Sequence, residues 1–329
     1  MLPIELVQVA SLLVLAGVSL AQVPPGHAAL FPEGLSVLNT RPRSIGLNNM
    51  QGVPFGFTQW AFGTVPQVCY NAAVDDGYCN VYDLEVYDVE YDDCAVPWTF
   101  CRCSDSPLSI EAFAGRVGRL PVAARQYARF FSSYGGNSSA FSFRNDITFF
   151  GPIEGQSVYI HELSHNLDRL YSPPDSLTSF SGTDEYANAV AADSCSPDDY
   201  AKTSYAEHYA QTSVMIAYDV TVGPIDSVRN TSCMANAFNA ARKHLAPIWQ
   251  FNEVGTCTSR LSEDDSPRVC MGPEAPCPGD PVRVASSDSE SDPEGFRWAP
   301  VVESVDDEEL ERKRRAEREA GMRGYAEIA

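Results

Sequence analysis

Two histidines and a glutamate form a pattern that could bind a metal ion and activate water. His161, Glu162 and His165 make an HExxH motif, the signature of zinc metallopeptidases. Residues four apart project from the same face of an α-helix, so both imidazoles can reach one zinc ion. A carboxylate beside that ion can take a proton from the bound water as it attacks a carbonyl. We therefore predict His161 and His165 as zinc ligands and Glu162 as the general base.

The residues around the motif favour a helix that packs against the protein core. Ile160, Leu163 and Leu167 recur at helical spacing, and uncharged residues flank the motif, as in the longer consensus of the zincin clan. The chain has five histidines in 329 residues, and on the order of 0.01 HExxH motifs are expected by chance in such a chain. We expect the metal helix to span residues 154–170. The alternative is a surface helix with two unrelated histidines.

The third zinc ligand is expected further along the chain, because a catalytic site usually has three protein ligands and one open position. Asp184 and Glu185 follow His165 at the distance typical of thermolysin-like and aminopeptidase-like sites. The segment around Asp184 also resembles the deuterolysin motif, one residue out of register. Glu207 lies in an aromatic-rich, helix-like segment, which is how lethal-factor-like zincins supply their glutamate. We favour Glu207 and keep Glu185 and Asp184 open.

Two further residues have predicted roles at the same site. Tyr200 precedes Glu207 by seven residues, the offset at which lethal-factor-like zincins place a tyrosine whose hydroxyl stabilises the oxyanion. Asp168 shares a helix face with His161 and His165 but lies too far along the axis to share the ion, so we expect it to orient His165. A packed core tyrosine is the alternative for Tyr200.

An N-terminal leader and an even number of cysteines indicate export. Residues 12–21 form a short apolar run ending in small residues, so we expect a signal peptide over residues 1–21 and a secreted, extracellular protein. Five cysteines precede the metal helix and five follow it, so at least one disulfide joins the two groups if all pair. Sequons at Asn137 and Asn230 fit a glycoprotein. A net charge of −21 argues against nucleic acid or anionic membrane as partners.

Composition divides the chain into three parts after the leader. Residues 22–60 are rich in Pro, Gly and Asn and predict an extended N-terminal arm. Residues 61–260 predict a disulfide-bonded catalytic domain, and the acidic residues 261–329 predict a disordered tail.

Within the domain, periodicity predicts the main elements. The strict alternation of residues 81–91 predicts a half-buried strand, and residues 147–150 predict a second strand. We expect this second strand to bind an extended peptide substrate at the sheet edge, as an edge strand before the metal helix does in zincins. The alternative is an ordinary core strand. Helical patterns occupy residues 107–133, 183–195, 204–221 and 235–245.

Four segments of the chain are similar to segments of a known family. They are Tyr91–Cys94, Tyr159–Asp168, Asp193–Ala201 and Tyr209–Gln211. These segments resemble a family of secreted fungal proteins called conidiation-specific, over residues 40–260. The resemblance implies a signal peptide, a disulfide-bonded zincin-like domain and metallopeptidase character, but no substrate.

Together these patterns predict an α+β, zincin-like fold in which a small disulfide-bonded mixed sheet packs on the helix that carries HExxH. The predicted function is that of a secreted zinc endopeptidase acting on peptide or protein substrates. His161, His165 and Glu207 would hold Zn²⁺, and Glu162 and Tyr200 would act on the substrate. The alternative is a catalytically inactive zincin-fold protein that binds a partner or associates with the cell wall or spore. The intact Glu162 counts against it, because an inactive site needs no base.

Overall fold

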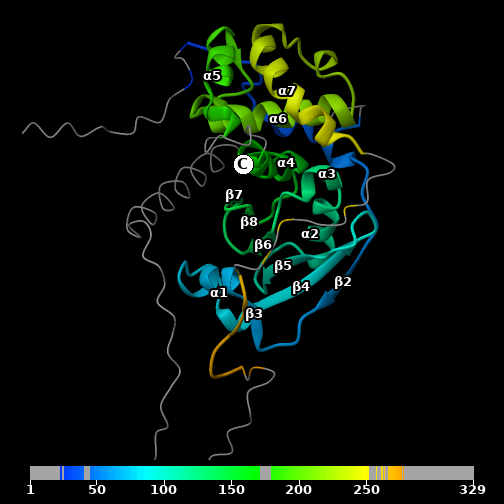
Figure 1. Cartoon of the computed structure of the whole chain (residues 1–329), viewed down its shortest axis with the longest axis vertical. Coiled ribbons are helices and arrows are strands. Elements are labelled where there is room, and N and C mark those ends of the chain that lie inside the picture. The colour runs from blue at the N-terminus through cyan, green and yellow to red at the C-terminus, as the bar shows by residue number, and fades with distance from the viewer. Residues whose placement is uncertain are drawn as a thin grey trace, which may run out of the picture.

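A six-stranded mixed sheet and a stack of helices form the fold, and helix α4 lies between them (Figure 1). The computed structural model describes residues 23, 26–40, 45–170, 179–251, 257, 261, 263, 266–275 and 277. The strands are β1 (Ala28–Ala29), β2 (Phe55–Gln59), β3 (Thr64–Pro66), β4 (Leu84–Tyr91), β5 (Trp98–Cys103), β6 (Phe130–Tyr134), β7 (Ser139–Phe143), β8 (Asp146–Phe150), β9 (Cys195–Ser196) and β10 (Arg268–Cys270). The α-helices are α1 (Gln67–Val74), α2 (Ile110–Val117), α3 (Val122–Arg125), α4 (Gln156–Leu170), α5 (Asp184–Ala191), α6 (Tyr205–Thr221) and α7 (Ala235–Trp249).

The six strands of the main sheet have the order β2-β4-β5-β6-β8-β7. β4 pairs antiparallel with β2 and β5, β6 pairs parallel with β5 and β8, and β7 runs antiparallel to β8. The edges are therefore β2 and β7, and β8 has a neighbour on each side. The predicted strand at residues 147–150 is confirmed as part of β8, but its expected place at a free edge is wrong. Local alternation specifies a strand without specifying which strand will lie beside it.

Alternation along the strands gives the sheet two different faces. One face packs on α2 and α4 through fully buried aromatic rings, among them Phe113, Phe149 and Tyr159. The rings of Phe149 and Tyr159 stack with their centroids 4.4 Å apart. The opposite face carries a smaller cluster with α1 and the disulfides of β5. The larger core therefore lies between the sheet and α4, and it fixes the position of that helix.

Helix α6 packs on α4, and α7 packs on α6 (Figure 1). Every residue of α6 from His208 to Tyr218 is buried, which is typical of a helix enclosed by protein on all sides. The hydroxyls of Ser164 in α4 and Ser213 in α6 are 2.7 Å apart, and Trp249 of α7 donates its indole N–H to Ser213 at 3.0 Å. The facing sides of α4 and α6 are thus tied together.

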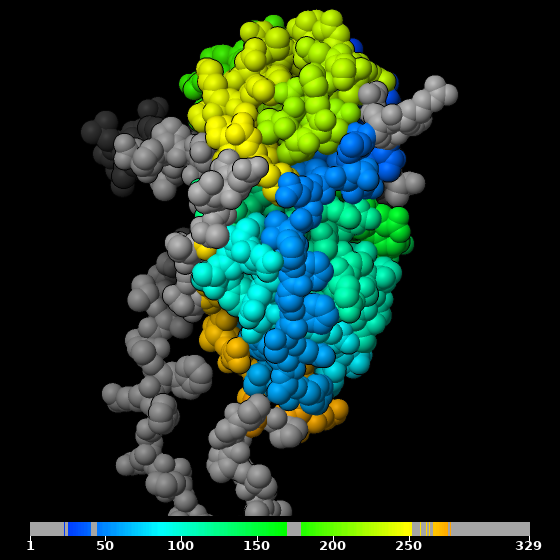
Figure 2. Space-filling model, turned by 90° about the vertical axis from the view of Figure 1, so that its right-hand side faces the viewer, coloured from blue at the N-terminus to red at the C-terminus, as the bar shows by residue number. Residues whose placement is uncertain are grey.

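The N-terminal segment, which comprises residues 26–40 and 45–59, packs closely on the rest of the molecule. Phe31, Leu35, Leu38 and Leu47 are each at most 3% exposed, and β2 completes one edge of the sheet. Figure 2 shows this segment, in blue, as a continuous band from the helical part down over the sheet. Burial of these apolar side chains means that the segment contributes to the core.

Five disulfides pair all ten cysteines. Cys69–Cys101 and Cys79–Cys103 lie before the metal helix, and Cys195–Cys233 and Cys270–Cys277 lie after it. Cys94–Cys257 joins the two groups, and its two cysteines are 163 residues apart in the sequence. The expectation of at least one crossing bridge is therefore confirmed.

The elements predicted from periodicity agree with the structure. β4 occupies most of residues 81–91, and α5, α6 and α7 fall at the predicted helical patterns. Two short helices, α2 and α3, fall within residues 107–133, but the helical pattern is wrong for residues 130–133, which belong to strand β6. Pro121 precedes the first residue of α3, where its missing N–H costs nothing. The predicted signal peptide and residues 278–329 of the predicted tail lie outside the described residues. Within the part of the chain that the structure describes, no helix combines the length and apolar character needed to cross a membrane.

Candidate metal centre

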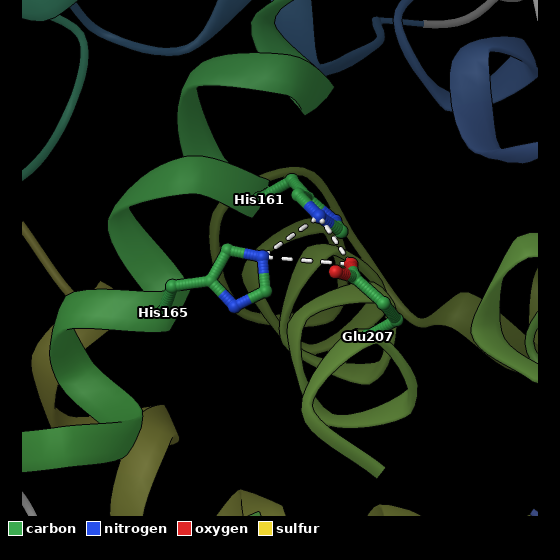
Figure 3. A group of neighbouring side chains, drawn as sticks. All are labelled: His161, His165 and Glu207. Atoms are coloured by element: carbon green, nitrogen blue, oxygen red, sulfur yellow. Dashed lines mark hydrogen bonds and ion pairs between the residues drawn. The ribbon is translucent and has the colours of Figure 1, made fainter. Parts of the chain in front are cut away.

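Three side chains from two helices converge on one point (Figure 3). His161 and His165 project from α4, and Glu207 projects from the first turn of α6. The Nε2 atoms of the two histidines are 3.1 Å apart, and Oε2 of Glu207 lies 3.0 Å from His161 Nε2 and 3.5 Å from His165 Nε2. A tetrahedral site with ligand distances of about 2.0–2.1 Å separates its ligand atoms by about 3.3 Å. The three atoms are therefore spaced as ligands of one ion.

The chemistry of the donor set also fits a small divalent cation. Two imidazole nitrogens and one carboxylate oxygen are the ligands that zinc commonly takes in hydrolytic sites. His161 is 2% exposed, whereas about a fifth of each of the His165 and Glu207 side chains is exposed, at 19% and 21%. The cluster is thus mostly enclosed, with two of its three side chains partly exposed to solvent.

Electrostatics within the cluster favour a positive charge at its centre. Burial lowers the pKa of His165, but the adjacent Glu207 carboxylate outweighs this and raises the pKa to about 9. Burial raises the pKa of Glu207, but His165 and His161 outweigh it and hold that pKa well below its usual range. Without a metal, a proton on His165 supplies the positive charge, and a divalent cation would displace that proton.

The N-terminus of the metal helix is capped by residues far away in sequence. Gly155 precedes α4 and has no side chain to accept the first free N–H groups. Asn39 accepts a hydrogen bond from the backbone N–H of Ser157 at 2.8 Å and donates one to its hydroxyl at 2.8 Å. Asn48 accepts from the backbone N–H of Gln156 at 2.8 Å. The N-terminal segment therefore positions the helix that carries both histidines.

The structure places the two residues predicted to act on the substrate beside this cluster. Glu162 is 2% exposed, and its carboxylate is close enough to raise the pKa values of both His165 and Tyr200. The ring of Tyr200 lies 5.7 Å from that of His161. Burial, followed by the Glu207 carboxylate, raises the pKa of Tyr200 far above its usual value, and the phenol is hydrogen-bonded to Glu207. Tyr200 is therefore a neutral donor at the site.

The rival third ligands lie elsewhere. Asp184 and Glu185 are exposed in the first turn of α5, and neither belongs to the cluster of potential ligands found among the described residues. The structure thus brings Glu207 to the two histidines and keeps its rivals apart from them.

Asp168 has a contact that sequence reasoning did not predict. Its carboxylate accepts hydrogen bonds from the backbone N–H and the hydroxyl of Ser181, at 2.7 Å and 2.5 Å. These bonds tie the last turns of α4 to the short 3₁₀ helix Phe180–Gly182. The role of Asp168 in orienting His165 stays a prediction.

Sequence reasoning missed two buried residues next to the cluster. Gln211 is 6% exposed and Asp198 is 2% exposed. Oε1 of Gln211 lies 3.3 Å from Nδ1 of His161, and Nε2 of Gln211 donates to Asp198 at 2.8 Å. Gln211 follows Glu207 by four residues, so the helical spacing that puts both on one face of α6 could have identified it. Asp198 lies in a loop, and no local pattern marks it.

Two comparisons with known proteins gave a match. The family model described as Conidiation-specific protein Con-13 matches residues 31–319. A curated relative from Neurospora crassa, named Conidiation-specific protein 13, is 41% identical over 269 residues, which are 81% of this chain and 78% of the relative. No solved structure matches the chain. Neither matching description names an activity.

Proposed function

The chain belongs to the Con-13 family of conidiation-specific proteins, and because that family description specifies no chemistry, we propose from the site itself that the protein is a secreted zinc metallopeptidase. The observation that carries the proposal is the triangle of His161 Nε2, His165 Nε2 and Glu207 Oε2, whose edges measure 3.0–3.5 Å. HExxH on a buried helix with a third ligand from a neighbouring helix is the ligand pattern of a zinc hydrolase.

A zinc ion in this triangle would polarise a carbonyl and lower the pKa of a water molecule. Glu162 follows His161 directly in α4, and its buried carboxylate would accept a proton from water and pass it to the leaving amine. Tyr200 stays protonated at neutral pH, because burial and Glu207 both raise its pKa. Its hydroxyl, which is bonded to Glu207 in this structure, would turn to donate to the oxyanion that develops on the substrate.

The substrate fits best along the edge strand β7. β8 is excluded as a docking strand, because it already pairs with β6 and β7. β7 lies at the edge of the sheet and contacts the metal helix, and Ser142 of β7 is hydrogen-bonded to Asn166 of α4. An extended peptide added to β7 gains main-chain hydrogen bonds beside the helix that carries HExxH. The partner class is thus a peptide or protein.

Secretion is supported by the five disulfides, which persist in oxidising compartments outside the cytosol. We expect the signal peptide at residues 1–21 to direct this export. The domain assignment, with a catalytic domain over residues 61–260, belongs to the same proposal.

The test is the metal content of the purified protein, followed by peptide hydrolysis. We expect one zinc per chain in the wild type and in Glu185→Gln, the matched control in an exposed rival, and little zinc in Glu207→Ala. Glu162→Gln should retain zinc and lose peptidase activity by about 10²–10⁴-fold, the usual contribution of a general base. Absence of stoichiometric metal from the wild type would refute the proposal. Zinc without hydrolysis of any peptide library would favour the inactive binding protein.

A further inference from the structure

A chain of two hydrogen bonds runs from a buried carboxylate to the metal cluster. Asp198 accepts from Gln211 Nε2 at 2.8 Å, and Gln211 Oε1 lies 3.3 Å from His161 Nδ1. All three side chains are at least nine-tenths buried, so water does not compete for these bonds. The opposite nitrogen of His161 faces His165 and Glu207. The two hydrogen bonds therefore end at Nδ1 of His161, the ring nitrogen opposite the one that faces the cluster.

The direction of donation along these two hydrogen bonds follows from Asp198, the acceptor at the end away from His161. An ionised carboxylate can only accept hydrogen bonds, so Gln211 must direct its NH₂ group to Asp198 and its carbonyl oxygen to His161. His161 must then carry its proton on Nδ1 in order to donate to that oxygen. Nε2, which faces His165 and Glu207, then carries the lone pair that a metal ion at the cluster would accept. This is the tautomer that a metal ion requires of His161.

The same carboxylate also supports the segment that carries Tyr200. Asp198 accepts from the backbone N–H of Ala201 at 2.9 Å, and the backbone of Leu35 supplies a further hydrogen bond. Three N–H donors thus converge on one buried carboxylate. These three donors suit a carboxylate that accepts hydrogen bonds, and they hold the NH₂ group of Gln211 toward Asp198.

We propose that Asp198 and Gln211 are positioning residues that set the tautomer and orientation of His161 for metal binding. The inference rests on the metal-binding part of the proposed function. Partners behind a metal-bound histidine usually contribute about 10–100-fold to metal affinity. Loss of either residue should therefore weaken zinc binding by this factor without removing any ligand.

The decisive experiment exchanges the two chemical groups. Each single variant disrupts the order of donors and acceptors along these two hydrogen bonds. In Asp198→Asn an amide NH₂ group faces the NH₂ group of Gln211, and in Gln211→Glu a second carboxylate faces Asp198. The double variant Asp198→Asn/Gln211→Glu restores this order, because the new amide donates to the new carboxylate, which accepts from His161. Zinc affinity, measured by competition with a chromophoric chelator, should fall about 10–100-fold in each single variant. In the double variant it should return to within about threefold of the wild type, the coupling expected within one network.

A control separates positioning from general loss of packing. Ser213→Ala removes two buried hydrogen bonds, one to Ser164 of α4 and one to Trp249 of α7, and leaves the side chains of the cluster and of Asp198 and Gln211 unchanged. It should lower the unfolding temperature and leave zinc affinity unchanged. If Gln211→Glu fails to fold, Gln211→Met replaces it as the single variant and should show the same loss of affinity.

The outcomes distinguish this inference from the proposed function. If the wild type binds no zinc, the proposed function fails, and the inference fails with it. If the wild type binds zinc and the single variants bind it equally well, only the positioning role is refuted. A double variant no tighter than the weaker single variant would refute it too, because the two residues would then act independently.

Discussion

Asn39 should contribute far more stability than an ordinary helix cap. The substitution Asn39→Ala removes two hydrogen bonds to Ser157, one to its backbone N–H and one to its hydroxyl, both 2.8 Å long. Asn39 and Ser157 are each 7% exposed, so water cannot replace the lost partner. Loss of a cap costs about 0.5–2 kcal/mol, and a buried polar group left without a partner costs about 1–3 kcal/mol more. We expect Asn39→Ala to lower the free energy of unfolding by about 2–4 kcal/mol.

The matched control is Ser109→Ala, at the cap of α2. Ser109 is exposed and accepts a single bond from the backbone N–H of Ala112 at 3.2 Å, so its loss should cost about 1 kcal/mol. Both variants are measured by urea denaturation with the disulfides intact. Asn39→Asp keeps the acceptor and should fall between the wild type and Asn39→Ala. If Asn39→Ala costs no more than Ser109→Ala, the capping of the metal helix by the N-terminal segment is not important for stability.

Two other features lead to further predictions. Arg125 is fully buried, lies over the rings of Tyr91 and Trp98 at 4.2 Å and 4.7 Å from their centroids, and forms an ion pair with Asp93. Arg125→Met should cost about 3–5 kcal/mol by leaving that carboxylate uncompensated, and adding Asp93→Asn should recover part of the loss in the same denaturation assay. Burial raises the pKa values of Tyr91 and Tyr134 above that of an unfolded phenol, so the unfolded state loses these protons first. Stability should therefore be complete below about pH 10 and decline above it, and phenolate absorbance should rise together with unfolding; a rise of the full tyrosine signal before unfolding would contradict this.

The sequence specifies those parts of the site that depend on local spacing. His161 and His165 are four residues apart in a segment with a regular apolar stripe, so the helix and the shared direction of both imidazoles follow directly. Glu207 was favoured on a resemblance of its segment, and the structure brings it to the histidines because α6 packs on α4. The distance between these two helices in space is not encoded by any short stretch of sequence.

The remaining parts of the site depend on contacts across long sequence separations. Asn39 caps a helix 118 residues away, and asparagine in a Gly- and Pro-rich segment reads locally as a turn residue. Asp198 lies in a loop, so periodicity says nothing about its burial. The position of β8 inside the sheet was missed for a related reason, because the chain reaches the edge at β7 before it returns to form β8.

The disulfide between Cys94 and Cys257 closes a covalent ring through the protein. All three side chains of the metal cluster lie inside this ring, on the segment between the two cysteines. A protease that nicks the backbone once anywhere in that segment opens the ring without separating the two pieces. The piece carrying His161 and His165 stays attached to the piece carrying Glu207, even if the cut falls between α4 and α6. The protein would thus survive a single internal cut in this segment as one molecule.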